Sequence, residues 1–194
     1  MKPKTKTKLK TKEVKIRVKS QISDLMLSDT YSTIKTIEMI NNEINNDSDI
    51  NTKRIIDFFV DDAVNDLVEY NTYGKMTDDG ENITIHYEES ELLDLEGLET
   101  MLIYNKNKPD IITMIRTGTV ITSIIFDQAE QRYICNYLTE FAPIEFCIYT
   151  NSVINNSDYE NGGIMILDYD IEIHGVRTER NKFCLQVTNI RNIN

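Results

Sequence analysis

Apolar and polar residues alternate along most of the chain from residue 66 onward. Runs with this two-residue period are separated by clusters of Gly, Pro, Asn or Asp roughly every ten residues, as in all-β proteins. Successive side chains of a strand point to opposite faces, so each run predicts a strand with one buried face. The clearest hairpin turn is residues 77–80, Thr-Asp-Asp-Gly, because Asp-Gly supplies the positive backbone dihedrals that a tight turn requires.

The connections between these runs are short, which favours strands that pair in sequential order. A strand as long as residues 164–174 is easiest to accommodate in a barrel, where every edge is paired. We therefore predict an all-β fold, with one antiparallel up-and-down barrel of about eight to ten strands over residues 13–194.

The chain begins with a basic segment. Residues 1–12, MKPKTKTKLKTK, are cationic and of low complexity, which predicts a disordered arm. From about residue 13 to 22, Val14, Ile16 and Val18 alternate with basic residues, and this is the pattern of a first strand. The alternation is unlike the continuous apolar segment of a signal peptide.

Residues 23–66 differ from the rest and predict an insertion between the first two strands. The segment NNEINNDSDIN is rich in turn-forming residues. After it, Ile55, Phe59 and Ala63 recur with helical spacing, so we expect the insertion to be partly helical. A helix that packs on the barrel and a helix that binds a partner both fit this pattern.

Charge and composition narrow the function classes. Residues 1–20 carry nine Lys/Arg and one acidic residue, although the whole chain has a net charge of −11. The barrel region is therefore acidic, which disfavours nucleic-acid binding over its surface and leaves the arm as the exception. Since no apolar run reaches about eighteen residues, we expect no membrane span and a cytoplasmic protein.

The chain shows no recognisable catalytic or metal-binding motif. It has no Walker loop, no GxGxxG and no G-x-S-x-G, so we expect no cofactor and no metal. The three cysteines, Cys135, Cys147 and Cys184, form no CxxC pair and lie in strand-like runs, which is typical of buried reduced thiols.

Residues of several of these strands and turns form an ordered series: Tyr87-Glu88-Glu89, Leu95-Glu96-Gly97 with Thr100, Arg116-Thr117-Gly118, Phe126, Tyr137-Leu138-Thr139, Thr150 and Tyr169. The series resembles the YwiB-like family of uncharacterised bacterial proteins, which have a lipocalin-like (calycin-type) β-barrel. The resemblance covers residues 66–190 and the first strand, and it implies the fold but no activity. Two departures are the long link between the first two strands and Phe141-Ala142-Pro143 in place of a Tyr-Gly step.

Arg116 is the main candidate for ligand contact. It shares a strand face with Ile112 and Met114, so it enters the barrel if that face points inward. A buried guanidinium needs a carboxylate or an anionic ligand, and we name Glu89 and Glu96 as partners. Three interpretations stay open: a structural Arg–Glu bridge at one barrel end, a clamp for a ligand carboxylate or phosphate, and a residue on the rim.

Aromatic and acidic residues supply further candidates. Tyrosines can line a pocket or fill a barrel core with the hydroxyl bonded to the backbone. Asp168, Asp170 and Glu172 share one face, which we expect to be a solvated outer surface. The candidate ligand-binding residues are Arg116, Glu89, Tyr87, Tyr137, Thr139 and Tyr169.

The sequence leaves three hypotheses for function. The first is a non-enzymatic barrel that binds a small molecule or peptide at its mouth. The second is an interaction or regulatory protein that contacts RNA, the ribosome or a protein partner through the insertion and the arm, with residues 1–12 making weak nucleic-acid contact. The third is a hydrolase or isomerase, which needs two titratable groups in one cleft, and the sequence places none together.

Overall fold

A computed structural model describes residues 9–24, 65–90, 97–118, 121–138 and 143–190, and all regular structure within these ranges is β-strand. The helical segments predicted inside the insertion fall on residues 25–64, outside the described residues. The strands are β1 (Lys10–Asp24), β2 (Asn65–Asp78), β3 (Asn82–Glu88), β4 (Glu99–Asn105), β5 (Lys108–Thr117), β6 (Ile121–Asp127), β7 (Arg132–Leu138), β8 (Pro143–Asn155), β9 (Gly163–Ile173) and β10 (Val176–Asn189).

The ten strands form one closed antiparallel barrel in sequential order. Closure occurs at β1, which pairs with β2 on one side and with β10 on the other. The predicted all-β up-and-down barrel is therefore confirmed. The predicted turn also forms, between the end of β2 at Asp78 and the start of β3 at Asn82, with Gly80 at a φ of 99°.

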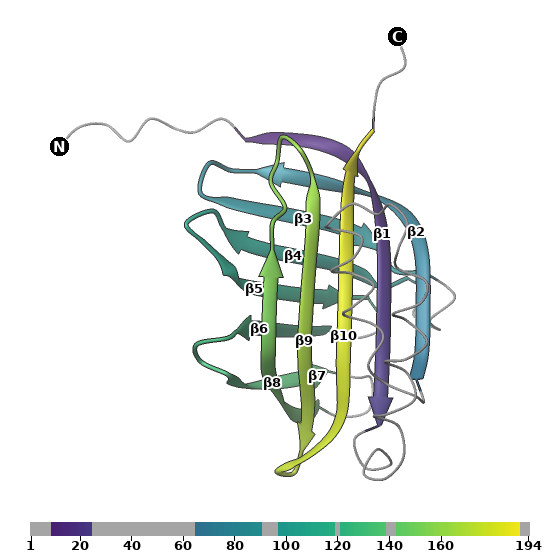
Figure 1. Cartoon of the computed structure of the whole chain (residues 1–194), viewed down its shortest axis with the longest axis vertical. Coiled ribbons are helices and arrows are strands. Elements are labelled where there is room, and N and C mark those ends of the chain that lie inside the picture. Colours follow the sequence, from purple (N-terminus) through teal and green to yellow (C-terminus); the bar gives the residue numbers. More distant parts are fainter. Residues whose placement is uncertain (1–8, 25–64, 91–96, 119–120, 139–142, 191–194) are drawn as a thin grey trace, which may run out of the picture.

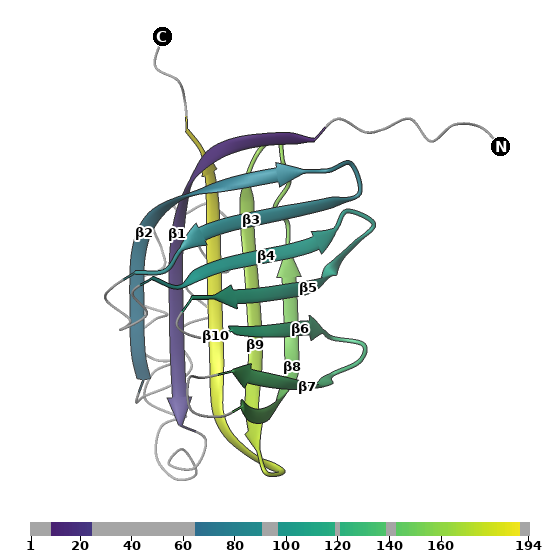
Figure 2. The same cartoon turned by 180° about the vertical axis from the view of Figure 1, so that it is seen from behind.

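The barrel is flattened into two layers whose strands cross. β1, β8, β9 and β10 run along the long axis of the molecule, and β3 to β7 cross behind them (Figure 1). Figure 2 shows from behind how β1 and β2 bend over one end to join the two layers. β1 starts and β10 ends at this same end of the molecule.

Apolar side chains fill the interior. They come from every strand of the barrel, and their alternation with exposed residues reproduces the sequence pattern, as β3 illustrates with Ile83, Ile85 and Tyr87 buried. Fully buried side chains from opposite layers include Ile16, Met76, Leu102, Met114, Phe126, Ile148 and Met165. The centre of the barrel is therefore a packed core.

The outer face of β9 differs from the expectation of a solvated surface. Asp168 and Asp170 are 6% and 5% exposed. Arg180 donates two hydrogen bonds to Asp168, of 3.0 and 2.8 Å, and Arg177 donates one of 3.1 Å to Asp170. These carboxylates are thus ion-paired and largely withdrawn from water, because buried charges require such partners.

The strand boundaries differ slightly from those expected. β1 begins at Lys10, so residues 10–12 belong to the barrel and not to the arm, whereas residues 1–8 lie outside the described residues. All three cysteines are buried and free, as expected. The described segments contain no helix with the length and apolarity that a membrane crossing requires.

Candidate functional site

A row of inward-facing residues crosses five strands near one end of the barrel. Tyr87 on β3 pairs with Thr100 on β4, Thr100 pairs with Arg116 on β5, Arg116 with Thr122 on β6, and Thr122 with Tyr137 on β7. Strand register places directly opposed residues in contact, so these side chains gather although up to 50 positions separate them in the sequence. The row is polar where neighbouring rows are apolar.

Glu89, just beyond the end of β3, is the centre of this cluster. Its Oε1 accepts a hydrogen bond of 2.5 Å from the Thr100 hydroxyl and lies 3.6 Å from Nη2 of Arg116. Its Oε2 accepts a hydrogen bond from the Tyr70 hydroxyl. The side chain of Glu89 is 1% exposed and that of Arg116 is 24% exposed, so the arginine is the member of the pair that reaches toward the mouth.

Electrostatics keep these groups in defined states. Burial lowers the pKa of Arg116, but Glu89 and the surrounding tyrosines raise it more, and the guanidinium stays charged. Burial, reinforced by Glu89, raises the pKa of both Tyr70 and Tyr87, so both remain neutral hydroxyls. The cluster therefore joins one cation and one carboxylate with neutral donors.

Three polar atoms of the row have no hydrogen-bond partner within the described part of the chain: Tyr87 Oη, Arg116 Nε and Thr122 Oγ1. The Tyr87 hydroxyl lies near Thr100 and Tyr70 without making a hydrogen bond of standard geometry to either. Buried polar atoms are nearly always satisfied, and each that is not costs about 1–3 kcal/mol. That three such atoms belong to one cross-strand row is the most distinctive polar feature of this barrel end.

The structure brings together four of the six candidate residues. Arg116, Glu89 and Tyr87 form the cluster, and Tyr137 ends the row, half-buried, with its ring centroid 6.4 Å from that of Phe146. Tyr169 faces the same interior, where its ring packs 4.8 Å from that of Phe126 and Arg116 acts on it electrostatically. Thr139 lies outside the described residues, as does Glu96, the other proposed partner of Arg116.

Three members of the cluster were not predicted: Tyr70, Thr100 as a donor, and Thr122. Each has a signal in the sequence. Tyr70 has the same strand parity as the buried Met76, and Thr122 has that of Ile124 and Phe126. For Thr100 and Thr122 the signal is a threonine at an inward-facing position of a strand. Only the strand register shows that both residues lie opposite Arg116.

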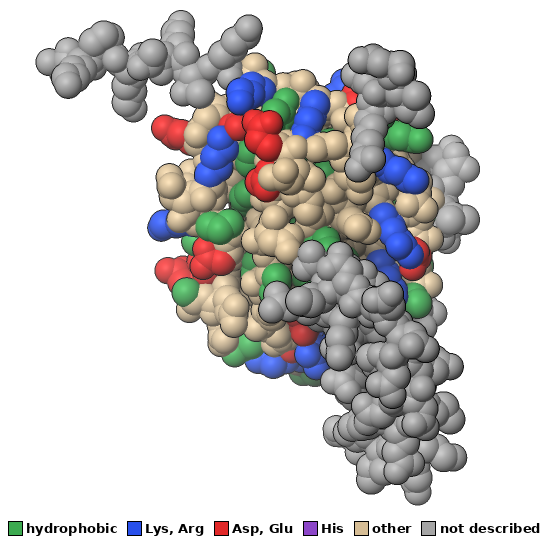
Figure 3. All heavy atoms as spheres, turned by 45° about the horizontal axis from the view of Figure 1, so that its top comes forward, with side chains coloured by type: hydrophobic (Ala, Val, Ile, Leu, Met, Phe, Trp, Pro, Cys, Tyr) green, Lys and Arg blue, Asp and Glu red, His purple; other side chains and the backbone are tan. Residues whose placement is uncertain are grey.

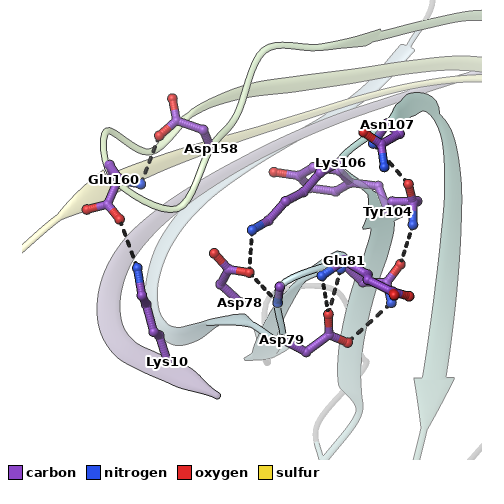
Figure 4. Close-up of polar contacts among 12 residues, drawn as sticks. Lys10, Asp78, Asp79, Glu81, Tyr104, Lys106, Asn107, Asp158 and Glu160 are labelled. Atoms are coloured by element: carbon purple, nitrogen blue, oxygen red, sulfur yellow. Dashed lines mark hydrogen bonds and ion pairs between the residues drawn. The ribbon is translucent and has the colours of Figure 1, made fainter. Parts of the chain in front are cut away.

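A pocket of about 590 Å³ opens at the opposite end of the barrel, where the β2–β3, β4–β5 and β8–β9 connections meet the start of β1. Ile83 and Tyr104 form buried walls, and the Tyr104 hydroxyl donates a 2.7 Å hydrogen bond to the Ser157 carbonyl. Figure 4 shows two ion pairs at this pocket, Lys106 with Asp78 and Lys10 with Glu160.

The two ion pairs differ in strength. Lys106 Nζ lies 2.5 Å from Asp78 Oδ1, and the Asp78 side chain is 11% exposed. The hydrogen bond from Lys106 holds the pKa of Asp78 below its usual value. Lys10 Nζ is 3.5 Å from Glu160 Oε1, and these side chains are 57% and 74% exposed. Exposed pairs of this kind contribute only about 0–1 kcal/mol, so the Lys10–Glu160 pair separates readily.

Other chemistry at either end is limited. The described residues contain no group of three or more His, Cys, Asp or Glu side chains placed to hold a metal ion. His86 is exposed, with Nε2 3.2 Å from Glu99 Oε2. The hypothesis of contact with RNA, the ribosome or a protein partner rests on the basic arm and the insertion. Most of both, residues 1–8 and 25–64, lies outside the described residues.

Comparison with known proteins finds one matching family and a solved structure with a similar fold. A family profile described as Domain of unknown function (DUF1934) matches residues 50–185. A solved structure titled "Crystal structure of ywiB protein from Bacillus subtilis" is similar, with a TM-score of 0.58, 17% sequence identity, and coverage of 91% of this chain and 92% of that chain. No curated protein matches the chain. The structural likeness, at this identity, concerns the fold alone.

Proposed function

This chain belongs to the DUF1934 family, with the YwiB-like barrel described above, and we propose that it is a non-enzymatic binding protein that holds a small molecule or peptide at the mouth beside Arg116. The observation that carries the proposal is the presence, in one cross-strand row, of Tyr87 Oη, Arg116 Nε and Thr122 Oγ1 without protein partners among the described residues. A ligand that pairs with these atoms removes a cost that the free protein bears.

The charges of Arg116 and Glu89 determine which kind of ligand suits this site. Glu89 already neutralises Arg116, and it accepts hydrogen bonds from Tyr70 and Thr100 as well. A carboxylate or phosphate would place a second negative charge beside buried Glu89, which is unfavourable at low dielectric. The site instead suits a neutral acceptor, such as the carbonyl oxygen of an amide, which takes a hydrogen bond from Arg116 Nε–H.

The packed core below the polar row determines where the proposed ligand can lie. Below the polar row, Met114 and Leu102 are fully buried and continue the core, so no ligand fits along the barrel axis. The proposed ligand therefore sits across the mouth, with a polar group directed inward. This places it near Tyr137, whose half-buried ring offers an apolar face and a polar tip.

The test is native mass spectrometry of the protein purified from its own cells. We expect a bound mass in the wild type that Thr122→Val and Tyr87→Phe reduce, because each removes one unpaired atom and keeps the side-chain shape. Arg17→Gln is the control away from this mouth, since Arg17 pairs with Glu69 on the exposed surface.

Each outcome decides the matter. A bound mass that Thr122→Val and Tyr87→Phe lower and Arg17→Gln leaves unchanged supports the proposal. A wild-type protein that carries no ligand, or a ligand retained equally by all variants, contradicts it. Circular dichroism of each variant confirms that the barrel is intact.

A further inference from the structure

We propose that the pocket at the opposite end of the barrel is a second binding site, and that it takes a small zwitterion, a free amino acid or short peptide, between Lys10 and Glu160. The pocket shares no residue with the mouth beside Arg116, so binding here does not depend on a ligand there. The geometry of the ion pairs, the charge of the lining and the apolar walls all support such a ligand.

The Lys10–Glu160 pair is the element that a ligand replaces. Lys10 extends from the start of β1, and Glu160 from the β8–β9 loop across the pocket (Figure 4). Both side chains are mostly exposed, and their 3.5 Å contact contributes little to stability. A zwitterion inserted between them gives its carboxylate to Lys10 and its ammonium to Glu160, so neither charge loses a partner.

The rest of the pocket anchors the loop that carries Glu160 and surrounds the two exposed side chains. Asp158 accepts hydrogen bonds of 2.8 Å from the backbone N–H of both Glu160 and Asn161, which fixes the loop that carries Glu160. The Lys10 ammonium also lies 5.7 Å from the centroid of the Tyr159 ring. On the other side, the Lys106–Asp78 pair is shorter than the Lys10–Glu160 pair, and its carboxylate is the less exposed of the two carboxylates.

The net charge of the lining distinguishes ligand classes. The lining contains two lysines, Lys10 and Lys106, and three carboxylates, Asp78, Asp158 and Glu160. Figure 3 shows acidic and basic side chains side by side at this end of the barrel. Lys12 on β1 also interacts electrostatically with Glu160 and Asp158, so both signs of charge are present at the pocket. A lone anion meets these carboxylates and a dication meets these lysines, so the mixed charge favours a ligand that carries both signs.

The size of the pocket and the polarity of its walls also suit a small zwitterion. A volume of about 590 Å³ is in the range of small-molecule sites. Ile83, Tyr104 and Pro109 give apolar walls for a side chain of the ligand. An amino acid or dipeptide with an apolar side chain therefore matches both the charged rim and the walls.

The experiment titrates the full-length protein by isothermal calorimetry with four probes. They are Gly-Leu as the zwitterion, N-acetyl-glycyl-leucine amide as its uncharged analogue, putrescine as a dication, and inorganic phosphate as an anion. We expect saturable binding of Gly-Leu and none of the other three. Lys10→Met and Glu160→Gln should each weaken Gly-Leu at least tenfold without unfolding, because both residues are exposed.

The controls separate this site from its surroundings and from the other mouth. Lys15→Met changes an exposed lysine of the same strand and should leave binding unchanged. Thr122→Val should also leave it unchanged, because Thr122 lies at the opposite end, so failure here and failure of the proposed function are distinguishable. Equal binding of the uncharged analogue, binding of putrescine or phosphate alone, no Gly-Leu binding, or equal affinity of the Lys10 and Glu160 variants would overturn the inference.

Discussion

Arg116 lies opposite Thr100 in the strand register, and its Nη2 is 3.6 Å from Oε1 of Glu89 at the end of the neighbouring hairpin. The contact joins a carboxylate that is 1% exposed to a guanidinium that is 24% exposed. The charge of Glu89 therefore depends almost wholly on protein partners, whereas Arg116 retains some access to water. Loss of this pair should consequently cost more stability than loss of a pair on the surface.

Glu89→Gln should destabilise the fold by about 2–3 kcal/mol, because it leaves Arg116 without its counter-charge and disrupts the hydrogen bonds from Tyr70 and Thr100. Urea unfolding measures the change. The control is Glu69→Gln, which breaks the exposed pair with Arg17 and should cost less than about 1 kcal/mol. A loss no greater for Glu89→Gln than for this control would show that the buried pair has no structural role.

Removal of the hydroxyl should affect stability differently at two tyrosines of the same cluster. Tyr70→Phe removes a hydrogen bond to a carboxylate and should lower the free energy of unfolding by about 1.5–3 kcal/mol. Tyr87→Phe removes a buried hydroxyl without a partner among the described residues, so it should leave stability unchanged or raise it by about 1 kcal/mol. Chemical unfolding of the two variants, compared with each other, checks the difference; a loss of equal size in both would mean that the Tyr87 hydroxyl is satisfied.

The free energy of unfolding should decrease at alkaline pH. Burial raises the pKa of both Cys135 and Cys184 from 9.0 to about 11. Well below pH 9 the thiols are protonated in folded and unfolded states alike, so they add no pH dependence there. Between pH 9 and 11 the unfolded state releases its protons first, and each thiol then costs about 2 kcal/mol of stability by about pH 10.5.

Urea unfolding at about pH 8 and about pH 10.5, on either side of the unfolded thiol pKa, measures this loss. The double variant Cys135→Ala, Cys184→Ala removes both titrating thiols, so its stability should fall less over the same interval although it starts lower. Burial also raises the pKa of Tyr70, Tyr87 and Tyr169, and their hydroxyls account for part of the decline that remains. An equal decline in wild type and double variant would contradict the assignment to the thiols.

Gly74 should be hard to replace. A Cβ at this position would lie 2.4 Å from the backbone oxygen of His86 and 2.6 Å from Cδ1 of Ile16, so Gly74→Ala should cost about 1–3 kcal/mol through overpacking. Gly175→Ala is the comparison, because a Cβ there meets nothing within 4 Å and only its φ of +82° opposes it, at about 1 kcal/mol. Thermal unfolding ranks the two, and a larger loss at Gly175 would contradict the packing argument.

Much of the fold is present in the sequence because a two-residue period is a local signal. The alternation along Ile83, Ile85 and Tyr87 identifies both a strand and its inner face, and the same parity directs Arg116 inward. Glu89 was one of two acidic residues, with Glu96, named as partners for this buried guanidinium. The hydroxyl partners of Glu89 were not predicted, because register depends on which strands close against each other.

The pocket at the other end gives no local signal at all. Its charged residues belong to turns, and residues such as Asp78 and Glu160 are ordinary turn residues when considered one at a time. Only closure of the barrel places the β2–β3 and β8–β9 connections beside the start of β1. The filled interior has no local signal either, since composition alone does not determine whether side chains meet across a barrel.

The position of β1 between β2 and β10 has a consequence for how the chain is made. Val14 pairs with Asn189, so the sheet closes through contacts between opposite ends of the chain. A growing polypeptide exposes the β1 edge until β10, Val176–Asn189, has been synthesised. Contacts so distant in sequence fold slowly. Synthesis that stops anywhere before β10 therefore releases an open sheet with an unpaired edge, because the barrel closes only when β10 pairs with β1.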